Sequence, residues 1–253
     1  MINATLRAGT RRLAIAAALV LAPAVLPAQE LPAAADVMAK YNQAIGGEAA
    51  FAKLPGMHST GTYAIPAMGL TGELEVFTAR PNLNLVRINV AGMGEITQGY
   101  DGETAWATNP MQGPRIITGE ELKQITDEAH FDSALRLIDK FQSAETVEQT
   151  EMAGQACYRV RLVWPSGRES FECYSVDTGL IVGSTAKAES EMGTVEATSL
   201  VQEYREFDGI TVPTKTVIQI MGMEQVLTIT AIEFVAPPAT TFELPADIRA
   251  LKN

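Results

Sequence analysis

The spacing of apolar residues changes along the chain in a way that divides it into three parts. Residues 13–26 form an apolar run without charge, and residues 32–45 place apolar side chains at helical spacing. From residue 57 onward apolar and polar residues mostly alternate. Alternation with a period of two predicts β-strands, whereas a spacing of three to four predicts helices. We therefore expect a leader, a short helix and then a mainly β (α+β) domain.

The alternating part contains about eleven predicted strands, separated by Gly, Pro and Asp-Gly turn signals. Short loops between successive strands favour antiparallel pairing in a sheet that curls toward a barrel. The predicted strands cover residues 60–65, 70–79, 83–90, 96–100, 103–108, 158–164, 171–176, 180–187, 194–205, 211–221 and 225–235.

Two helical segments accompany the strands. The first follows the leader, with Pro32 suited to its first turn, and Gly46-Gly47 ends it. The second is an insert over residues 118–140, where Thr118 and Glu121 have the spacing of a capping box. Its apolar stripe includes Leu122 and Ile125, and a kink is expected near residues 131–133.

The two cysteines, Cys157 and Cys173, flank a predicted hairpin over residues 164–168, with Gly167 in the left-handed position. Pairing residue 164 with residue 168 sets Cys173 opposite Arg159, diagonal to Cys157 on the same face. Diagonal neighbours are about 7–8 Å apart, slightly beyond normal disulfide reach. An even number of cysteines in an exported chain favours a structural disulfide. One β-bulge would bring the two cysteines within bonding distance; without a bulge they stay unbonded.

Residues 1–28 have the layout of a secretory signal peptide, in which three arginines precede the apolar run and Pro27-Ala28 ends it. The run is shorter than the roughly 20 residues of a membrane span. No cysteine that could carry a lipid lies near the cleavage region. We expect residues 29–253 to form one exported, soluble domain without a permanent membrane anchor.

Charge and motif content exclude several functions. The net charge is -11, and removal of a leader with three arginines leaves -14, which disfavours nucleic acid and anionic membranes as partners. His58 and His130 lack zinc-hydrolase spacing, and no serine-nucleophile or phosphate-binding motif occurs. Acidic pairs such as Glu73 and Glu75 fit a solvated strand face. No catalytic residue, metal ligand or cofactor is predicted.

Three groups of residues resemble bacterial envelope proteins of the outer-membrane lipoprotein-sorting (LolA/LolB-like) superfamily over nearly the whole chain after the leader. These are Ile45-Gly46-Gly47 with Gly61; residues 99–106 with Asn109-Pro110, Gly113-Pro114 and 119–121; and residues 177–180, 204–210, Pro213 and 242–245. The resemblance implies a periplasmic half-open antiparallel barrel of about eleven strands, with helices closing its concave side. It also implies an apolar cavity for acyl chains.

The sequence thus favours a non-catalytic periplasmic protein that binds or carries a hydrophobic ligand, such as a lipid or a lipoprotein acyl chain. A methionine-rich composition would suit an adaptable lining. The residues predicted to line the cavity are Leu85, Trp106, Leu122, Ile125, Trp164, Ile220 and Met221.

Two alternatives remain. A non-catalytic accessory module that docks an envelope protein would have a filled interior and an exposed apolar patch. A hydrolase with dispersed carboxylates would need a buried carboxylate cluster in a cleft.

Overall fold

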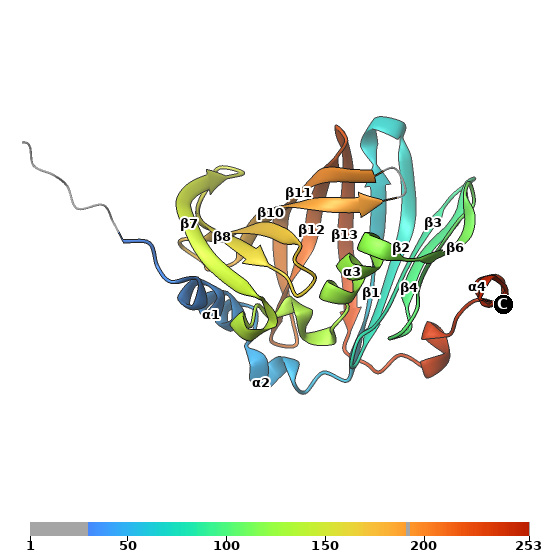
Figure 1. Cartoon of the computed structure of the whole chain (residues 1–253), viewed down its shortest axis with the longest axis horizontal. Coiled ribbons are helices and arrows are strands. Elements are labelled where there is room, and N and C mark those ends of the chain that lie inside the picture. The colour runs from blue at the N-terminus through green and yellow to red at the C-terminus, as the bar shows by residue number, and fades with distance from the viewer. Residues whose placement is uncertain (1–29, 191–192, 253) are drawn as a thin grey trace, which may run out of the picture. The chain divides into compact units, whose positions relative to one another are not determined.

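A computed structural model describes residues 30–190 and 193–252, and residues 31–253 form one compact unit. The predicted signal peptide lies outside the described residues. The unit is mainly β, because thirteen strands pair antiparallel in a single sheet that curls without closing (Figure 1). The expected curled, half-open antiparallel fold is therefore confirmed.

The strands follow the order β6-β5-β4-β3-β2-β1-β13-β12-β11-β10-β9-β8-β7 across the sheet. The first and last strands of the chain thus pair with each other inside the sheet. The bounds are β1 Gly56–Ile65, β2 Leu70–Ala79, β3 Leu83–Val90, β4 Gly94–Tyr100, β5 Ala105–Asn109, β6 Gly113–Ile117, β7 Ser143–Met152, β8 Gln155–Val163, β9 Glu169–Ser175, β10 Ile181–Ser190, β11 Gly193–Phe207, β12 Ile210–Ile220 and β13 Met223–Glu233.

The eleven predicted strands are present, and the two that were not predicted, β6 and β7, form the two edges of the sheet. Edge strands carry weaker sequence signals because solvent reaches them on more sides. Proline is tolerated there, and Pro114 lies in β6. Strand β7 is rich in Glu, Gln and Thr and has no fully buried residue, so it lacks a clear alternation.

The helices are short and cluster around the sheet. They are α1 Ala34–Ala44, α2 Glu48–Phe51, η1 Pro66–Met68, α3 Gly119–Glu128, η2 Phe131–Ala134, η3 Ile138–Lys140, η4 Ala239–Phe242 and α4 Ala246–Leu251. The predicted insert is thus one α-helix followed by two 3-10 turns. The predicted capping box is wrong: Thr118 makes no side-chain cap, and the carboxylate of Glu121 accepts two hydrogen bonds of 2.7 and 2.9 Å from Arg115 instead.

Each face of the sheet has its own packed cluster. On the inner face, α1, α2 and the insert pack against β8, β9 and β12, and α3 covers Tyr100, Ala105 and Ile117. Trp106 follows Ala105 in the strand and so points to the outer face. There its ring lies across Gly99, where a Cβ atom would come within 2.2 Å of it, and the C-terminal segment covers it.

Candidate functional site

Three adjoining cavities surround the insert and form the candidate site. The inner cavity, of about 160 Å³, lies between α1, α2, the insert and the starts of β12 and β3. The polar cavity, of about 350 Å³, lies between the insert and strands β9 and β10. The outer cleft, of about 580 Å³, opens beside the tip of the β8–β9 hairpin.

The inner cavity is lined mainly by apolar side chains. They come from segments far apart in the sequence, including Tyr41, Ile45, Phe51, Leu54, Met57, Phe131, Ile210, Val212 and Phe234. Glu128, Ser133 and Ala134 line both this cavity and the polar cavity. Arg168 and Ala186 in turn line both the polar cavity and the outer cleft. The apolar inner cavity therefore adjoins the polar cavity, which in turn adjoins the outer cleft.

A buried ion pair forms the wall of the polar cavity. Nε of Arg136, on the insert, lies 2.9 Å from both carboxylate oxygens of Glu172 on β9, and Tyr174 donates its hydroxyl to the same carboxylate. Burial opposes the charge of Arg136, but Glu172 outweighs it and raises the arginine pKa. Burial, helped by Glu172 and opposed by Arg136, raises the pKa of Tyr41 to about 12. The tyrosines therefore stay neutral at physiological pH.

The same arginine ties the insert to α1. Its backbone N–H donates to Oδ1 of Asn42 at 2.7 Å, and Nδ2 of Asn42 donates back to the carbonyl of Arg136 at 3.0 Å. Asn42 is buried, so this reciprocal pair satisfies polar groups that would otherwise be costly to desolvate.

Arg168, in the β8–β9 hairpin, binds the end of α3. Its Nη2 donates to Glu128 at 2.6 Å, and its Nε lies 3.6 Å from the buried carboxylate of Asp127. Asp127 also accepts from the backbone N–H and hydroxyl of Ser166 in the same hairpin, at 3.2 and 2.5 Å. One hairpin tip thus holds the C-terminal end of α3.

Arg80, after β2, binds the first 3-10 turn of the insert. It donates to both oxygens of Asp132 at 2.7 and 2.8 Å and to the carbonyls of Phe51 and Leu54, and its guanidinium stacks 4.6 Å from the ring of Phe131. Together with Arg115 on Glu121, four arginines pair with carboxylates on or beneath the insert. They anchor it over the inner face.

The seven residues predicted to line a cavity do not come together. Trp164 lines the polar cavity, where its Nε1 donates to Ser170 at 2.8 Å. Leu122 and Ile125 lie on the side of α3 that packs against the sheet. Leu85 and the fully buried Trp106 lie on the outer face under Phe242 and Ile248. Ile220 and the exposed Met221 lie at the β12–β13 turn. A binding role for these residues stays a prediction.

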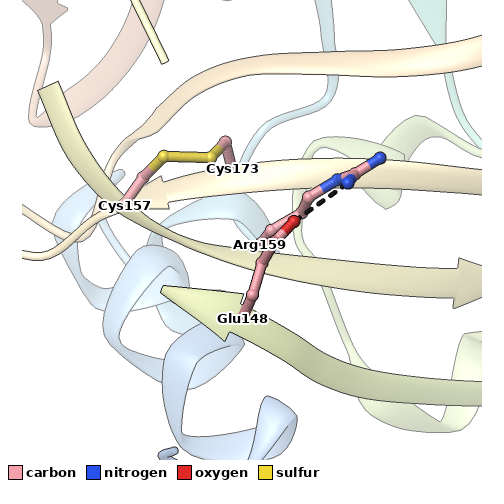
Figure 2. Close-up of a disulfide and its surroundings, with 4 residues drawn as sticks. All are labelled: Glu148, Cys157, Arg159 and Cys173. Atoms are coloured by element: carbon pink, nitrogen blue, oxygen red, sulfur yellow. Dashed lines mark hydrogen bonds and ion pairs between the residues drawn. A yellow bond between two sulfur atoms is a disulfide. The ribbon is translucent and has the colours of Figure 1, made fainter. Parts of the chain in front are cut away.

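The cysteines form the expected disulfide, and Figure 2 shows it joining β8 and β9 beside the Arg159–Glu148 ion pair. The predicted register is present, with Arg159 opposite Cys173, and the hairpin bonds join Trp164, Gly167 and Arg168 as expected. The expected bulge is absent from this pair of strands, yet the Cα atoms lie 5.4 Å apart. The twist of paired strands shortens one of the two diagonals, which removes the need for a bulge.

The charged residues around the insert were missed by sequence reasoning. Glu172 carried a usable signal, because it pairs across the strands with the inward-facing Val160, where a carboxylate needs a buried partner. Arg136 and Asp127 carried none, since their partners lie 36 and 39 residues away. Within the described residues, no group of three His, Cys, Asp or Glu side chains could hold a metal ion.

Comparison with known proteins gives the fold. No family model and no curated protein matches the chain. A LolA superfamily protein from Nitrosomonas europaea is 12% identical, covers 85% of this chain and 99% of its own, and superimposes with a TM-score of 0.56. The fold is that of the LolA superfamily proteins.

Two further solved structures share this LolA-like fold. A DUF1329 family protein from Desulfovibrio piger is 13% identical, with coverages of 83% and 95% and a TM-score of 0.57. A domain from Vibrio parahaemolyticus, named for outer membrane lipoprotein sorting, is 11% identical, with coverages of 87% and 98% and a TM-score of 0.53. No helix among residues 30–190 and 193–252 has the length and apolarity to cross a membrane.

Proposed function

We propose that this protein is a non-catalytic periplasmic carrier that holds the acyl chain of a lipid or lipoprotein beneath the insert. The observation that carries the proposal is the apolar inner cavity, which lies between α1 and the insert and adjoins the polar cavity. The LolA-like fold, the leader pattern and the disulfide support an exported carrier, because disulfides persist in oxidising compartments.

The volume of the inner cavity sets a condition on the proposal. Sites that bury a whole small molecule are about 300–1,000 Å³, whereas the inner cavity measures about 160 Å³. Acyl chains of full length therefore require the insert to shift outward. The insert is held by ion pairs, hydrogen bonds and the apolar contacts of Leu122, Ile125 and Leu135, whereas the sheet below is held by continuous strand pairing.

The cavities also favour a carrier over an envelope interaction module, for which we would expect a filled interior.

The test is uptake of palmitate by the purified protein. The protein is unfolded and refolded to remove co-purified lipid, titrated with palmitate at micromolar concentration and examined by native mass spectrometry. We expect one-to-one complexes and a change in tryptophan fluorescence, because Trp164 lines the polar cavity. Failure to form any complex with a refolded, cooperatively unfolding protein would contradict the proposal.

A matched pair of variants locates the site. Ala134 lines both the inner and the polar cavities, so Ala134→Phe would occupy the space between them. We expect it to weaken palmitate binding at least tenfold. Ala231→Phe adds the same ring to an exposed position of β13 that lines none of the three cavities, and should leave binding unchanged. Equal effects of both variants would place the ligand elsewhere.

A further inference from the structure

Four hairpin turns carry methionine at their tips. Met68 lies between β1 and β2, Met93 between β3 and β4, and Met111 between β5 and β6. Met221 lies between β12 and β13, and Met223 begins β13. We call these five residues the Met row.

The four turns are neighbours in space although they are far apart in the sequence. The strands that they join are consecutive in the sheet, in the order β6-β5-β4-β3-β2-β1-β13-β12, and every pair is antiparallel. Alternate turns of such a sheet lie at the same end, about two strand spacings or roughly 10 Å apart. In Figure 1 the tips of the β1–β2 and β12–β13 hairpins lie side by side at the top.

Four residues of the Met row are exposed, and Met93 is half-buried. Met111 is 81% exposed, Met68 58%, Met221 57% and Met223 41%. Single exposed apolar residues are common on soluble proteins. Here, however, four of the eight large apolar side chains exposed in the described residues lie on one row of turns. Half of these exposed apolar side chains are thus gathered at one end of the sheet.

The two ends of these hairpins differ in charge. Residues 66–69, 91–93, 110–112 and 221–222 contain no charged side chain. The turns at the opposite end contain Arg80, Asp101 with Glu103, and Asp208. In a chain of net charge -11, four successive uncharged turns stand out. The first acids next to the Met row, Glu95 and Glu224, lie on the strands just behind the turns.

We propose that the Met row contacts a zwitterionic lipid surface, with the hairpin tips inserted at the level of the headgroups. Methionine is flexible and apolar, so it adapts to an irregular, fluid surface. Separate tips about 10 Å apart suit lipid better than a protein partner, which needs a continuous complementary patch of roughly 800 Å². Glu95, Glu224 and the net negative charge disfavour anionic lipids. The proposal does not depend on the cavities.

The test compares binding to vesicles of phosphatidylcholine with binding to vesicles containing about one-third phosphatidylglycerol. The exported protein is mixed with each and the bound fraction is measured by flotation. We expect binding to phosphatidylcholine and weaker binding to the anionic vesicles. The variant Met68→Ser/Met111→Ser/Met221→Ser should bind phosphatidylcholine about a hundredfold more weakly, from roughly fivefold for each partly inserted side chain.

The control variant is Ile138→Ser/Val235→Ser, which removes two exposed apolar side chains outside the Met row and should change binding less than about twofold. Oxidative footprinting gives a readout that altered folding would not mimic: Met68, Met111 and Met221 should be protected on vesicles, and their protection should vanish without lipid. Three results would overturn the proposal. They are no binding of the unaltered protein to either vesicle, equal loss in both variants, or a self-association that the methionine substitutions abolish.

Discussion

Glu172 carries a buried charge that joins the insert to the sheet. Its carboxylate is buried and accepts from Arg136 and Tyr174, which lie on different elements. Removing one partner of a buried ion pair leaves an uncompensated charge, which costs about 3–5 kcal/mol.

We expect Glu172→Gln to lower the free energy of unfolding by about 3 kcal/mol in urea denaturation, since Arg136 keeps its charge. The matched control is Glu169→Gln on the same strand, where an exposed carboxylate pairs with Arg161; this variant should unfold at the unaltered midpoint. Replacing both partners, as in Arg136→Met/Glu172→Leu, should restore part of the loss. Equal midpoints for Glu172→Gln and the unaltered protein would contradict this account.

Asp132 makes the stability depend on pH. Hydrogen bonds from Arg80 hold the pKa of this carboxyl below its ordinary value of 3.8 in the folded state. Its stabilising contribution is therefore complete above that value and is lost as the pH falls through the lower, folded pKa. In urea denaturation at a series of pH values, Asp132→Asn should be less stable than the unaltered protein at pH 7. The difference between the two should shrink below about pH 4; a difference that is constant with pH would argue against this role.

At the scale of elements, the chain pattern predicted the eleven strands whose apolar residues alternate, the helical insert and the β8–β9 register. It failed at β6 and β7, where solvent on the edge removes the need for alternation.

The candidate site was harder to predict. Trp164 was proposed from its strand pattern and does line a cavity, but Arg136, Arg168 and Asp132 act through partners on other elements. Such pairings depend on the final topology and leave no local signal.

The disulfide joins β8 and β9 and closes a loop with a sequence separation of 16. Cross-linking a loop of about this length stabilises a protein by about 3 kcal/mol through the unfolded chain. We expect Cys157→Ser/Cys173→Ser to lose about that much in urea denaturation. Both sulfur-bearing side chains are buried, so dithiothreitol should reduce the bond only under unfolding conditions. Reduction of the native protein within minutes, with an unchanged unfolding midpoint, would contradict both expectations.

At the scale of the molecule, the insert is held to the sheet by ion pairs, hydrogen bonds and apolar packing, but not by strand pairing. It should therefore open before the sheet unfolds. Arg168→Met would remove the partner of Asp127 and Glu128. Hydrogen exchange of residues 119–141 should then accelerate about tenfold or more, corresponding to roughly 1.4 kcal/mol, while β12 and β13 stay unchanged.

The control for this measurement is Arg205→Met, since Arg205 forms an exposed ion pair with Glu203 on β11 and lines none of the three cavities. It should leave exchange in the insert unaltered. Uniform acceleration across the sheet in the Arg168 variant would mean that the insert and the sheet unfold together.

The pairing of β1 with β13 also has a consequence for the order of folding. His58 lies opposite Glu233, so this pairing joins residues 175 positions apart, and it links the hairpins β1–β6 to strands β7–β12. The sheet therefore stays in two unjoined parts until almost the entire chain has emerged. Contacts so distant in sequence form slowly. The hairpins β1–β6 therefore wait with the edge of β1 unpaired until β13, the last strand of the sheet, has been made.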